Sequence, residues 1–531
     1  MCILCDQGKP QNHSRSQLGR RDFLKASSAA AAGAAGMGLF ATPPARAGHD
    51  DDPPPYDHGR RGRRYVIRNG HVMTMDSSMK NKGELVEADV AVDGTKILAV
   101  GKNLRVGGAT EIDARGRIVM PGFIDTHHHQ FETAIRSFLA DGLLFNDLDP
   151  SGHGTINYFQ YILGTFAPVY RPRDVYISEL FGSLSQLDAG VTTSHDISQI
   201  HYTKEHSEAA IKGSADSERR IVFGFFEGAD PTLAAPLDGW YPNGATWLKK
   251  KYFSSNDQLM TMFMGGEIYL QPQPAVYTQS WKLARQLGIP IAAHIVGSFG
   301  MAGEFEDIAT GLREVQFDDD CLFIHVTGMP DKAWEVMADK GCGVSLAVPI
   351  EMNMRHGTPP IIKTLQYGIQ PSLSVDVEVT LTADMFTQMR SAMTLQRMFE
   401  NARALGESYA AGFPKLPLLT SRDVLRFATV EGAKDLKLDH KVGTLTPGKE
   451  ADIIILDAEA INVHPLNVVP GAVVSLMERS NVETVIVAGK IRKWKGQLLD
   501  VNLRRLRHEL ENSRDYLFHA AGVPQDLFRP N

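Results

Sequence analysis

Short apolar runs alternate with amphipathic stretches across residues 119–436, and this alternation constrains the fold more than any other feature of the chain. Apolar runs separated by helix-like stretches favour parallel strands joined by helical crossovers. Eight such runs fit an α/β fold of the closed (β/α)8 TIM-barrel type better than an open sheet. The runs end near His129, Ile197, Phe226, Glu267, His294, Val326, Ala347 and Asp376, and helix-like stretches include 173–189, 279–287 and 332–340.

Both flanks of this middle region are rich in strand-like segments. Residues 65–118 contain short alternating runs at 66–70, 89–94 and 96–101, and residues 437–500 contain similar runs at 448–457 and 482–490. We therefore expect the two flanks to form one small composite β-sandwich domain. The remaining segment, 501–531, is predicted to be a helical tail whose charged amphipathic stretch 503–517 packs on the barrel.

The first 47 residues have the pattern of an export signal. Arg20-Arg21 precedes an Ala/Gly-rich apolar stretch that runs to about Phe40, and Ala45-Arg46-Ala47 resembles a cleavage site. We interpret residues 1–47 as a twin-arginine signal peptide and 48–64 as a polar linker. This predicts passage through the twin-arginine export machinery to the periplasm or beyond, without stable membrane insertion after cleavage. A membrane anchor or a disordered basic tail is the alternative.

Composition excludes some partners. The 531 residues carry a formal charge of -7, so the chain lacks the basic surface expected of a nucleic-acid-binding protein. A homo-oligomer is compatible with a large barrel. Cys2 and Cys5 fall in the signal segment, whereas Cys321 and Cys342 lie on strands expected to be neighbours. The latter two form either a disulfide or a pair of buried thiols, and we favour the thiols.

The segment Met120-Pro121-Gly122-Phe123-Ile124-Asp125-Thr126-His127-His128-His129 points to metal chemistry. Side chains two apart on a strand face the same way, so His127 and His129 can both enter the barrel mouth while His128 points away. Neutral imidazoles bind zinc and similar divalent ions. A polar strand end, without metal, is the alternative for three adjacent histidines considered alone.

Three further polar residues favour a metal site over a polar strand end. His294, His325 and Asp376 each end an apolar run, which is where barrel enzymes place their catalytic groups. A single such residue is more often a cap or a core residue. Five in this order favour a shared metal site.

On these motifs the chain resembles the amidohydrolase superfamily, in the branch that contains cytosine deaminase and the triazine hydrolases. The resemblance spans about residues 65–498 and includes the segment 443–452, Gly-Thr-Leu-Thr-Pro-Gly-Lys-Glu-Ala-Asp. It implies that one divalent metal ion is held by His127, His129, His294 and Asp376. It also implies that Asp376 takes a proton from the activated water and that His325 polarises the substrate. Zinc is the default ion, although iron(II) or manganese(II) fit the same ligands.

One position departs from the family pattern. Deaminases of this branch usually carry a proton-shuttling glutamate three residues after the strand-five histidine, and here that position is Gly297. Glu351 is either a substitute catalytic group or a solvent-facing loop acid; His356 and Glu267 are weaker substitutes. The cluster His195–His201 either contacts substrate or forms structural hydrogen bonds.

Together these features predict a metal-dependent hydrolase of a non-peptide C–N bond in a small cyclic or heteroaromatic molecule. Deamination and the opening of a cyclic amide or amidine are the two main reactions. A related hydrolase that expels halide or thiolate, and a periplasmic metal- or ligand-binding protein on a degenerate barrel, are the alternatives.

Overall fold

The computed structural model describes residues 53–55, 58–146, 153–228, 239–268 and 274–529. From Pro54 onward, these residues belong to one compact unit, Pro54–Asn531. The predicted signal peptide, 1–47, lies outside the described residues. Among the helices described, none is long and apolar enough to span a membrane.

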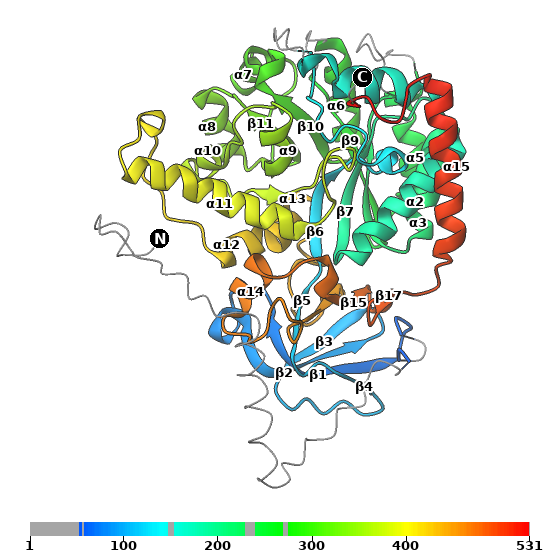
Figure 1. Ribbon diagram of the computed structural model, residues 1–531, viewed down its shortest axis with the longest axis vertical. Coiled ribbons are helices and arrows are strands. Elements are labelled where there is room, and N and C mark those ends of the chain that lie inside the picture. Colours follow the sequence, from blue (N-terminus) through cyan, green and yellow to red (C-terminus); the bar gives the residue numbers. More distant parts are fainter. Residues whose placement is uncertain (1–52, 56–57, 147–152, 229–238, 269–273, 530–531) are drawn as a thin grey trace, which may run out of the picture. The chain divides into compact units, whose positions relative to one another are not determined.

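Eight parallel strands form the barrel at the centre of this unit (Figure 1), which confirms the predicted fold class. The first and last strands meet through two backbone hydrogen bonds. The amide of His129 donates to the carbonyl of Asp376, and the amide of Asp376 donates to the carbonyl of His127, both at 3.0 Å. The strands are β6 (Phe123–His128), β7 (Val191–Ser198), β8 (Arg220–Phe225), β9 (Met260–Gly265), β10 (Ile291–Val296), β11 (Cys321–Thr327), β12 (Gly343–Leu346) and β13 (Ser372–Leu373).

Helices cover the outside of the barrel, so its strands are buried on both faces. Every residue of β8 and β11 is buried, as expected for parallel strands with apolar sequences. The helices predicted at 173–189, 279–287 and 332–340 correspond to α2 (Pro172–Asp188), α6 (Pro274–Leu287) and α8 (Asp331–Lys340). The other helices are α3 (Lys204–Asp216), α4 (Trp240–Asn243), α5 (Ala245–Lys251), α7 (Ala302–Ala309), α9 (Val348–Asn353), α10 (Ile361–Gln366), α11 (Met385–Ala404), α12 (Ser421–Arg426), α13 (Gly432–Asp435) and α14 (Val469–Ser475).

A second sheet combines strands from both ends of the described chain, as the sequence predicted. Its order is β17-β16-β15-β14-β5-β1-β2-β3, with β4 paired to β1. The two chain ends meet where β5 pairs antiparallel with β14, placing Met120 opposite Ile454. The strands are β1 (Arg64–Met73), β2 (Glu84–Asp93), β3 (Lys96–Gly101), β4 (Thr110–Asp113), β5 (Arg117–Pro121), β14 (Ile453–Asp457), β15 (Val482–Val487), β16 (Lys490–Trp494) and β17 (Gln497–Leu498).

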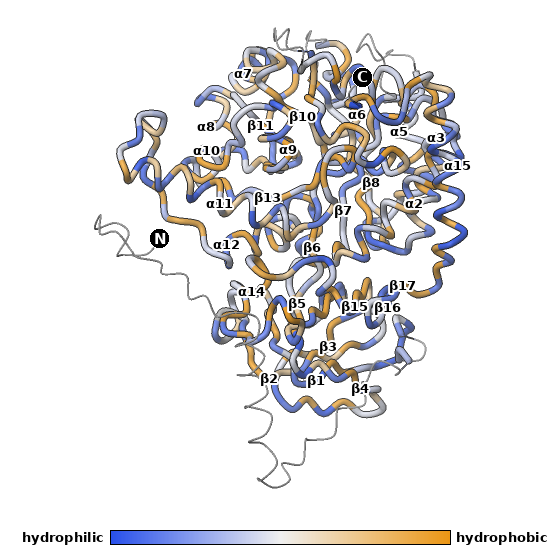
Figure 2. Tube along the Cα trace, in the orientation of Figure 1, coloured by the Kyte–Doolittle hydropathy of each residue, from blue (hydrophilic) through white to orange (hydrophobic). Residues whose placement is uncertain are grey.

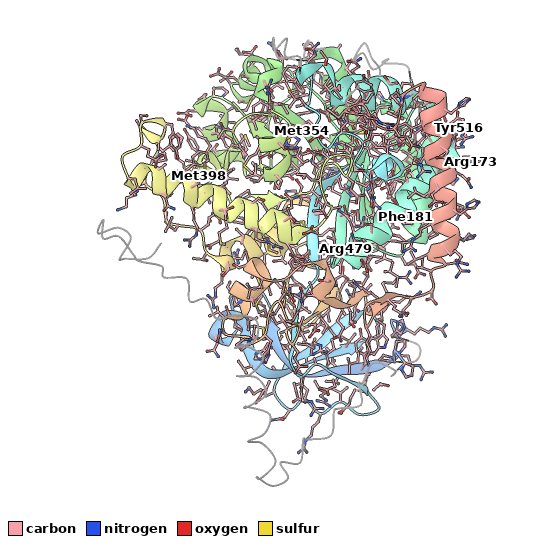
Figure 3. All side chains as sticks on the ribbon, viewed as in Figure 1. Arg173, Phe181, Met354, Met398, Arg479 and Tyr516 are labelled. Atoms are coloured by element: carbon pink, nitrogen blue, oxygen red, sulfur yellow. The ribbon has the colours of Figure 1, made fainter. Side chains whose placement is uncertain are left out.

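The last helix, α15 (Leu503–Ala521), packs along α2 (Figure 1). Its tube is largely hydrophilic with short apolar stretches (Figure 2), as expected of an amphipathic helix. Phe518 stacks edge-on against Phe138 and Phe166, and Ser513 donates a hydrogen bond to Asp174. The side chain of Tyr516 can be followed on this helix in Figure 3. The helix therefore packs on the barrel, as predicted.

Cys321 and Cys342 are both buried and both free. They precede Leu322 and Gly343, which are paired in the β11–β12 register, so the two thiols sit on adjacent strands. Each thiol donates to a nearby oxygen, of Asp320 in one case and of Asp318 in the other. The structure therefore contains the two buried thiols that we favoured.

Candidate metal centre

Three imidazoles meet at the carboxyl end of the barrel. Nε2 of His127, near the end of β6, lies 2.9 Å from Nε2 of His129 and 3.0 Å from Nε2 of His294 on β10. One hydrogen on His127 can serve only one of these two contacts. His127 Nε2 therefore lies close to both other ring nitrogens, and His127 and His129 share one side of the chain, as the alternation along β6 predicted.

Asp376 lies beside His127 and His129. Its Oδ1 is 3.5 Å from Nε2 of His127 and 3.4 Å from Nε2 of His129. Its Oδ2 faces the other way and lies 3.7 Å from Nε2 of His325 on β11. The structure thus brings together all five residues singled out from the sequence.

Two of these residues have a left-handed backbone conformation: His325, at an irregularity within β11, and Asp376, shortly after β13. The φ angles are 68° at His325, 53° at Val326 and 66° at Asp376. A left-handed conformation at a residue other than glycine costs on the order of 1–3 kcal/mol and persists only where the surroundings impose it. The parallel strand pairing and the barrel-closing hydrogen bonds supply that constraint here.

The donor set fits a divalent cation. Two ligand atoms about 2.1 Å from one ion stand about 3.0 Å apart at a right angle and about 3.4 Å apart at the tetrahedral angle. The separations among His127, His129 and Asp376, and the one between His127 and His294, match these values. Burial lowers the pKa of His127 and of His129 well below the usual value, which keeps both rings neutral and able to bind metal. Nitrogen and carboxylate ligands suit zinc, iron(II) or manganese(II).

Two buried glutamates hold the outer nitrogens of the histidines. Glu267 Oε1 lies 2.5 Å from Nδ1 of His294, and Oε2 accepts the backbone amide of the same residue at 3.2 Å. Glu351 Oε1 lies 3.1 Å from Nδ1 of His325 and accepts the amide of Ala347 at 2.9 Å. Such contacts fix the ring orientation and the tautomer.

The structure separates the two interpretations of Glu351. The residue lies in α9 and is 1% exposed, so the solvent-facing loop acid is wrong. Burial raises the pKa of its carboxyl well above the usual value. Glu351 acts on the site through His325, whereas Glu267, considered only as a weak substitute, contacts His294.

Gly297 begins the turn that follows β10 and leaves no room for a side chain. A Cβ atom built there would lie 2.5 Å from the carbonyl oxygen of Thr327 and 3.0 Å from the Cα of Gly328. Both neighbours are backbone atoms of the chain leaving β11, so they cannot swing away. The missing glutamate is therefore excluded by the packing of the two strand ends.

His128 points away from the three imidazoles, as predicted. Its Nε2 lies 3.8 Å from Glu378, too far for a hydrogen bond, and both ring nitrogens are buried without a hydrogen-bond partner among the residues described. Residues of the predicted cluster 195–201 do have structural partners. His195 Nδ1 lies 3.1 Å from the carbonyl of Thr126, and Asp196 accepts the amide of Gln130 at 3.3 Å. These contacts agree with the hydrogen-bonding interpretation of the segment His195–His201.

Glu132 and Tyr158 adjoin the site and were missed by sequence reasoning. Tyr158 donates to Glu132 Oε1 at 2.5 Å, and both side chains are buried. The second carboxyl oxygen of Glu132 has no partner in the described part of the chain, and the Tyr158 ring lies 6.3 Å from that of His129. Glu132 could have been suspected from the sequence, because it is an acidic residue three positions after His129. Nothing in the sequence indicated Tyr158.

A parallel barrel with imidazoles and a carboxylate gathered around His127 at the carboxyl ends of its strands is typical of a metal-dependent hydrolase. Residues 118–492 match the Amidohydrolase family, so the chain belongs to that family. It is therefore an enzyme that hydrolyses carbon–nitrogen bonds other than peptide bonds.

Relatives and solved structures are similar over most of the chain. A 5-methylthioadenosine/S-adenosylhomocysteine deaminase from Desulfitobacterium hafniense is 26% identical over 475 residues, covering 83% of this chain and 95% of the relative. A 5'-deoxyadenosine deaminase from Methanosarcina mazei is 25% identical, covering 85% and 98%. An adenosine deaminase from Xanthomonas campestris with bound zinc has a TM-score of 0.70 at 19% identity, covering 87% of this chain and 100% of that one. Atrazine chlorohydrolase from Arthrobacter aurescens, complexed with zinc, has a TM-score of 0.68 at 20% identity, covering 85% and 100%.

Proposed function

We propose that the enzyme removes an exocyclic amine from a small nitrogen heterocycle by hydrolysis, releasing ammonia. The observation that carries this proposal is the position of Asp376, which faces His127 and His129 with one carboxyl oxygen and His325 with the other. Asp376 therefore belongs both to the proposed metal ligands, with His127 and His129, and to a pair with His325 that can transfer a proton. The deaminases that are similar over more than four-fifths of the chain support the choice of reaction.

The position of each residue indicates its role in metal binding or in proton transfer. His127, His129, His294 and Asp376 Oδ1 would hold the ion, for which we propose zinc. A divalent cation bound there would lower the pKa of a coordinated water molecule toward neutrality. Asp376 Oδ2 is placed to accept the proton that this water loses.

His325 is placed to pass a proton to the departing nitrogen. Its Nε2 faces Asp376 Oδ2, and its Nδ1 contacts Glu351. Burial and the neighbouring rings of His356, His294 and His129 lower the pKa of His325 well below its usual value, so a proton that His325 takes from Asp376 is readily passed on to the leaving nitrogen, while Glu351 fixes the orientation of the ring. In this scheme His325 and Glu351 take over the role of the glutamate that Gly297 excludes.

Opening of a cyclic amide or amidine is the second candidate, and Gly297 is the observation that favours it. Deaminases of this branch usually carry the proton-shuttling glutamate that Gly297 excludes, so its exclusion counts against ammonia release. Purified, zinc-loaded enzyme should be assayed against aminopurines, aminotriazines, cyclic ureides and cyclic amidines for free ammonia and for product mass. Ammonia together with an oxo product supports deamination. A product one water heavier than its substrate, without ammonia, supports ring opening and overturns the deaminase proposal.

The same assay tests the remaining alternatives. Release of halide or thiolate from substituted heterocycles, without action on their amines, would replace the deaminase proposal. Binding without turnover of any compound would support a binding protein on a degenerate barrel. Asp376→Asn should abolish turnover, whereas His201→Gln should not, because His201 Nδ1 contacts Ser207 away from the metal ligands.

We also propose that the chain is exported by the twin-arginine route. Arg20-Arg21, the apolar stretch that follows and Ala45-Arg46-Ala47 support this proposal. Expressed in a Gram-negative host, the full chain should appear in the periplasm with its amino terminus after Ala47. Replacing Arg20 and Arg21 by lysine should retain it in the cytoplasm. Export of that double variant at the parental level would contradict the proposal.

A further inference from the structure

His356 is a second imidazole, beside His325, that faces Oδ2 of Asp376, and the proposed mechanism gives it no role. It lies in the loop after α9 and is 3% exposed. Its Nε2 is 3.9 Å from Asp376 Oδ2, and its ring centroid is 4.6 Å from that of His325. The distance between Nε2 and Oδ2 is too long for a hydrogen bond between the His356 ring and the carboxylate.

The loop is held by its backbone, which leaves the His356 ring uncommitted. The carbonyl of His356 accepts hydrogen bonds from Thr327 Oγ1 at 2.7 Å and from Ser298 Oγ at 3.3 Å. Its Nδ1 is buried without a partner among the residues described. Since neither ring nitrogen secures the loop, a structural role alone does not account for an imidazole here.

The ligand atoms of His325, His356 and Asp376 all lie within 4.8 Å of one another. Asp376 therefore presents Oδ1 to His127 and His129, and Oδ2 to His325 and His356. A carboxylate in this position can bridge two cations about 3.5–4 Å apart.

Charge also leaves room for a second cation. Asp376, Glu267, Glu351 and Glu132 are all buried, and within the described ranges none of them pairs with a lysine or arginine. Buried carboxylates are otherwise paired or bound to metal. Asp376 Oδ2 therefore faces two imidazoles and, in the described part of the chain, no cationic side chain that would repel a metal ion is paired with it.

We infer that His325, His356 and Asp376 Oδ2 form a second, weaker subsite for a divalent cation of the zinc class. It has three ligands where the first has four, and its ion would be repelled by the neighbouring one, so it fills only at higher metal concentration. An ion there occupies Nε2 of His325, so excess metal inhibits the enzyme. The predicted inhibition rests on the proposed function, because a metal ion bound to His325 would prevent this residue from transferring a proton to the leaving nitrogen.

Equilibrium dialysis of the full enzyme against increasing zinc, with elemental analysis, tests this subsite. The parent should pass from one bound ion per chain to two, and its activity should fall as the second binds. His356→Ala should stop at one ion, and its inhibition constant for zinc should rise about tenfold or more relative to its own uninhibited rate. His201→Gln, a buried histidine elsewhere, should behave as the parent.

Anomalous diffraction from parent crystals soaked in excess zinc gives a readout that needs no variant. Two peaks flanking Asp376 support the subsite, and a single peak overturns it. Saturation of the parent at one ion, or His356→Ala binding two, also overturns it. A parent that binds one ion and turns over substrate leaves the proposed function intact, whereas an active parent that binds none contradicts both.

Discussion

Glu267 Oε1 lies 2.5 Å from Nδ1 of His294, the histidine whose Nε2 meets His127. Glu267 follows β9 and His294 lies within β10, and these two neighbouring strands pair in parallel. The glutamate thus reaches the metal centre from the next strand and turns the His294 ring toward it. A carboxylate in this position raises the basicity of a ligating imidazole.

Glu267→Gln should weaken metal binding, because an amide keeps the shape of the contact but removes its charge. We expect the zinc affinity to fall about 10- to 100-fold, measured by competition with a chromophoric chelator. Glu314→Gln, which affects only an exposed pair with Lys282, is the matched control. Equal affinities of parent and Glu267→Gln would show that Glu267 does not support His294.

Restoring the glutamate at Gly297 should damage the protein. Because a Cβ there meets the backbone of Thr327 at 2.5 Å, Gly297→Ala and Gly297→Glu should each lower the free energy of unfolding by about 1–3 kcal/mol or more. Activity should fall in both. Denaturant unfolding and ammonia release provide the measurements.

Gly303→Ala is the control for this pair of variants, since α7 leaves open space at that position and alanine favours a helix by about 0.5–1 kcal/mol. A stable and more active Gly297→Glu would mean that the strand ends can separate to admit the side chain.

The buried pair Arg220–Asp452 should contribute strongly to stability. Arg220 begins β8 of the barrel, and its guanidinium meets both carboxyl oxygens of Asp452, at 2.9 and 3.0 Å, just before β14 of the other sheet. Arg220→Met would leave a buried carboxylate uncompensated, which costs about 3–5 kcal/mol of unfolding free energy. Removing the exposed pair of Arg422 with Glu84 should cost only about 0–1 kcal/mol. Similar losses for the two would contradict this assignment.

Acid should destabilise the protein partly through Glu304. Hydrogen bonds from Arg313 and Tyr277 hold the pKa of Glu304 below its ordinary value of 4.5, although partial burial opposes this. A lowered pKa stabilises the fold above pH 4.5, and that contribution is lost as the pH falls through the folded-state pKa. Glu304→Gln should therefore lose less unfolding free energy than the parent between about pH 5 and pH 3. Parallel stability curves would exclude this contribution.

Periodicity and strand ends were sufficient to predict the barrel and the five central residues. The alternation that places His127 and His129 on one side of β6 is a local property, and parallel strands bring their carboxyl ends to one rim. Contacts that depend on the third dimension could not be predicted in this way. The burial of Glu351 beneath His325, the closure of space at Gly297 and the approach of Tyr158 to Glu132 all depend on how loops fold back over the barrel mouth.

Metal content measured together with activity tests the central claim most directly. Purified enzyme should contain at least one zinc or similar divalent ion per chain, lose activity on exhaustive chelation and regain it when one equivalent is returned. His127→Ala should lose the tightly bound ion and the activity together. Full activity in chelated protein with no stoichiometric ion, or in His127→Ala without bound metal, would contradict a hydrolase built on His127, His129, His294 and Asp376.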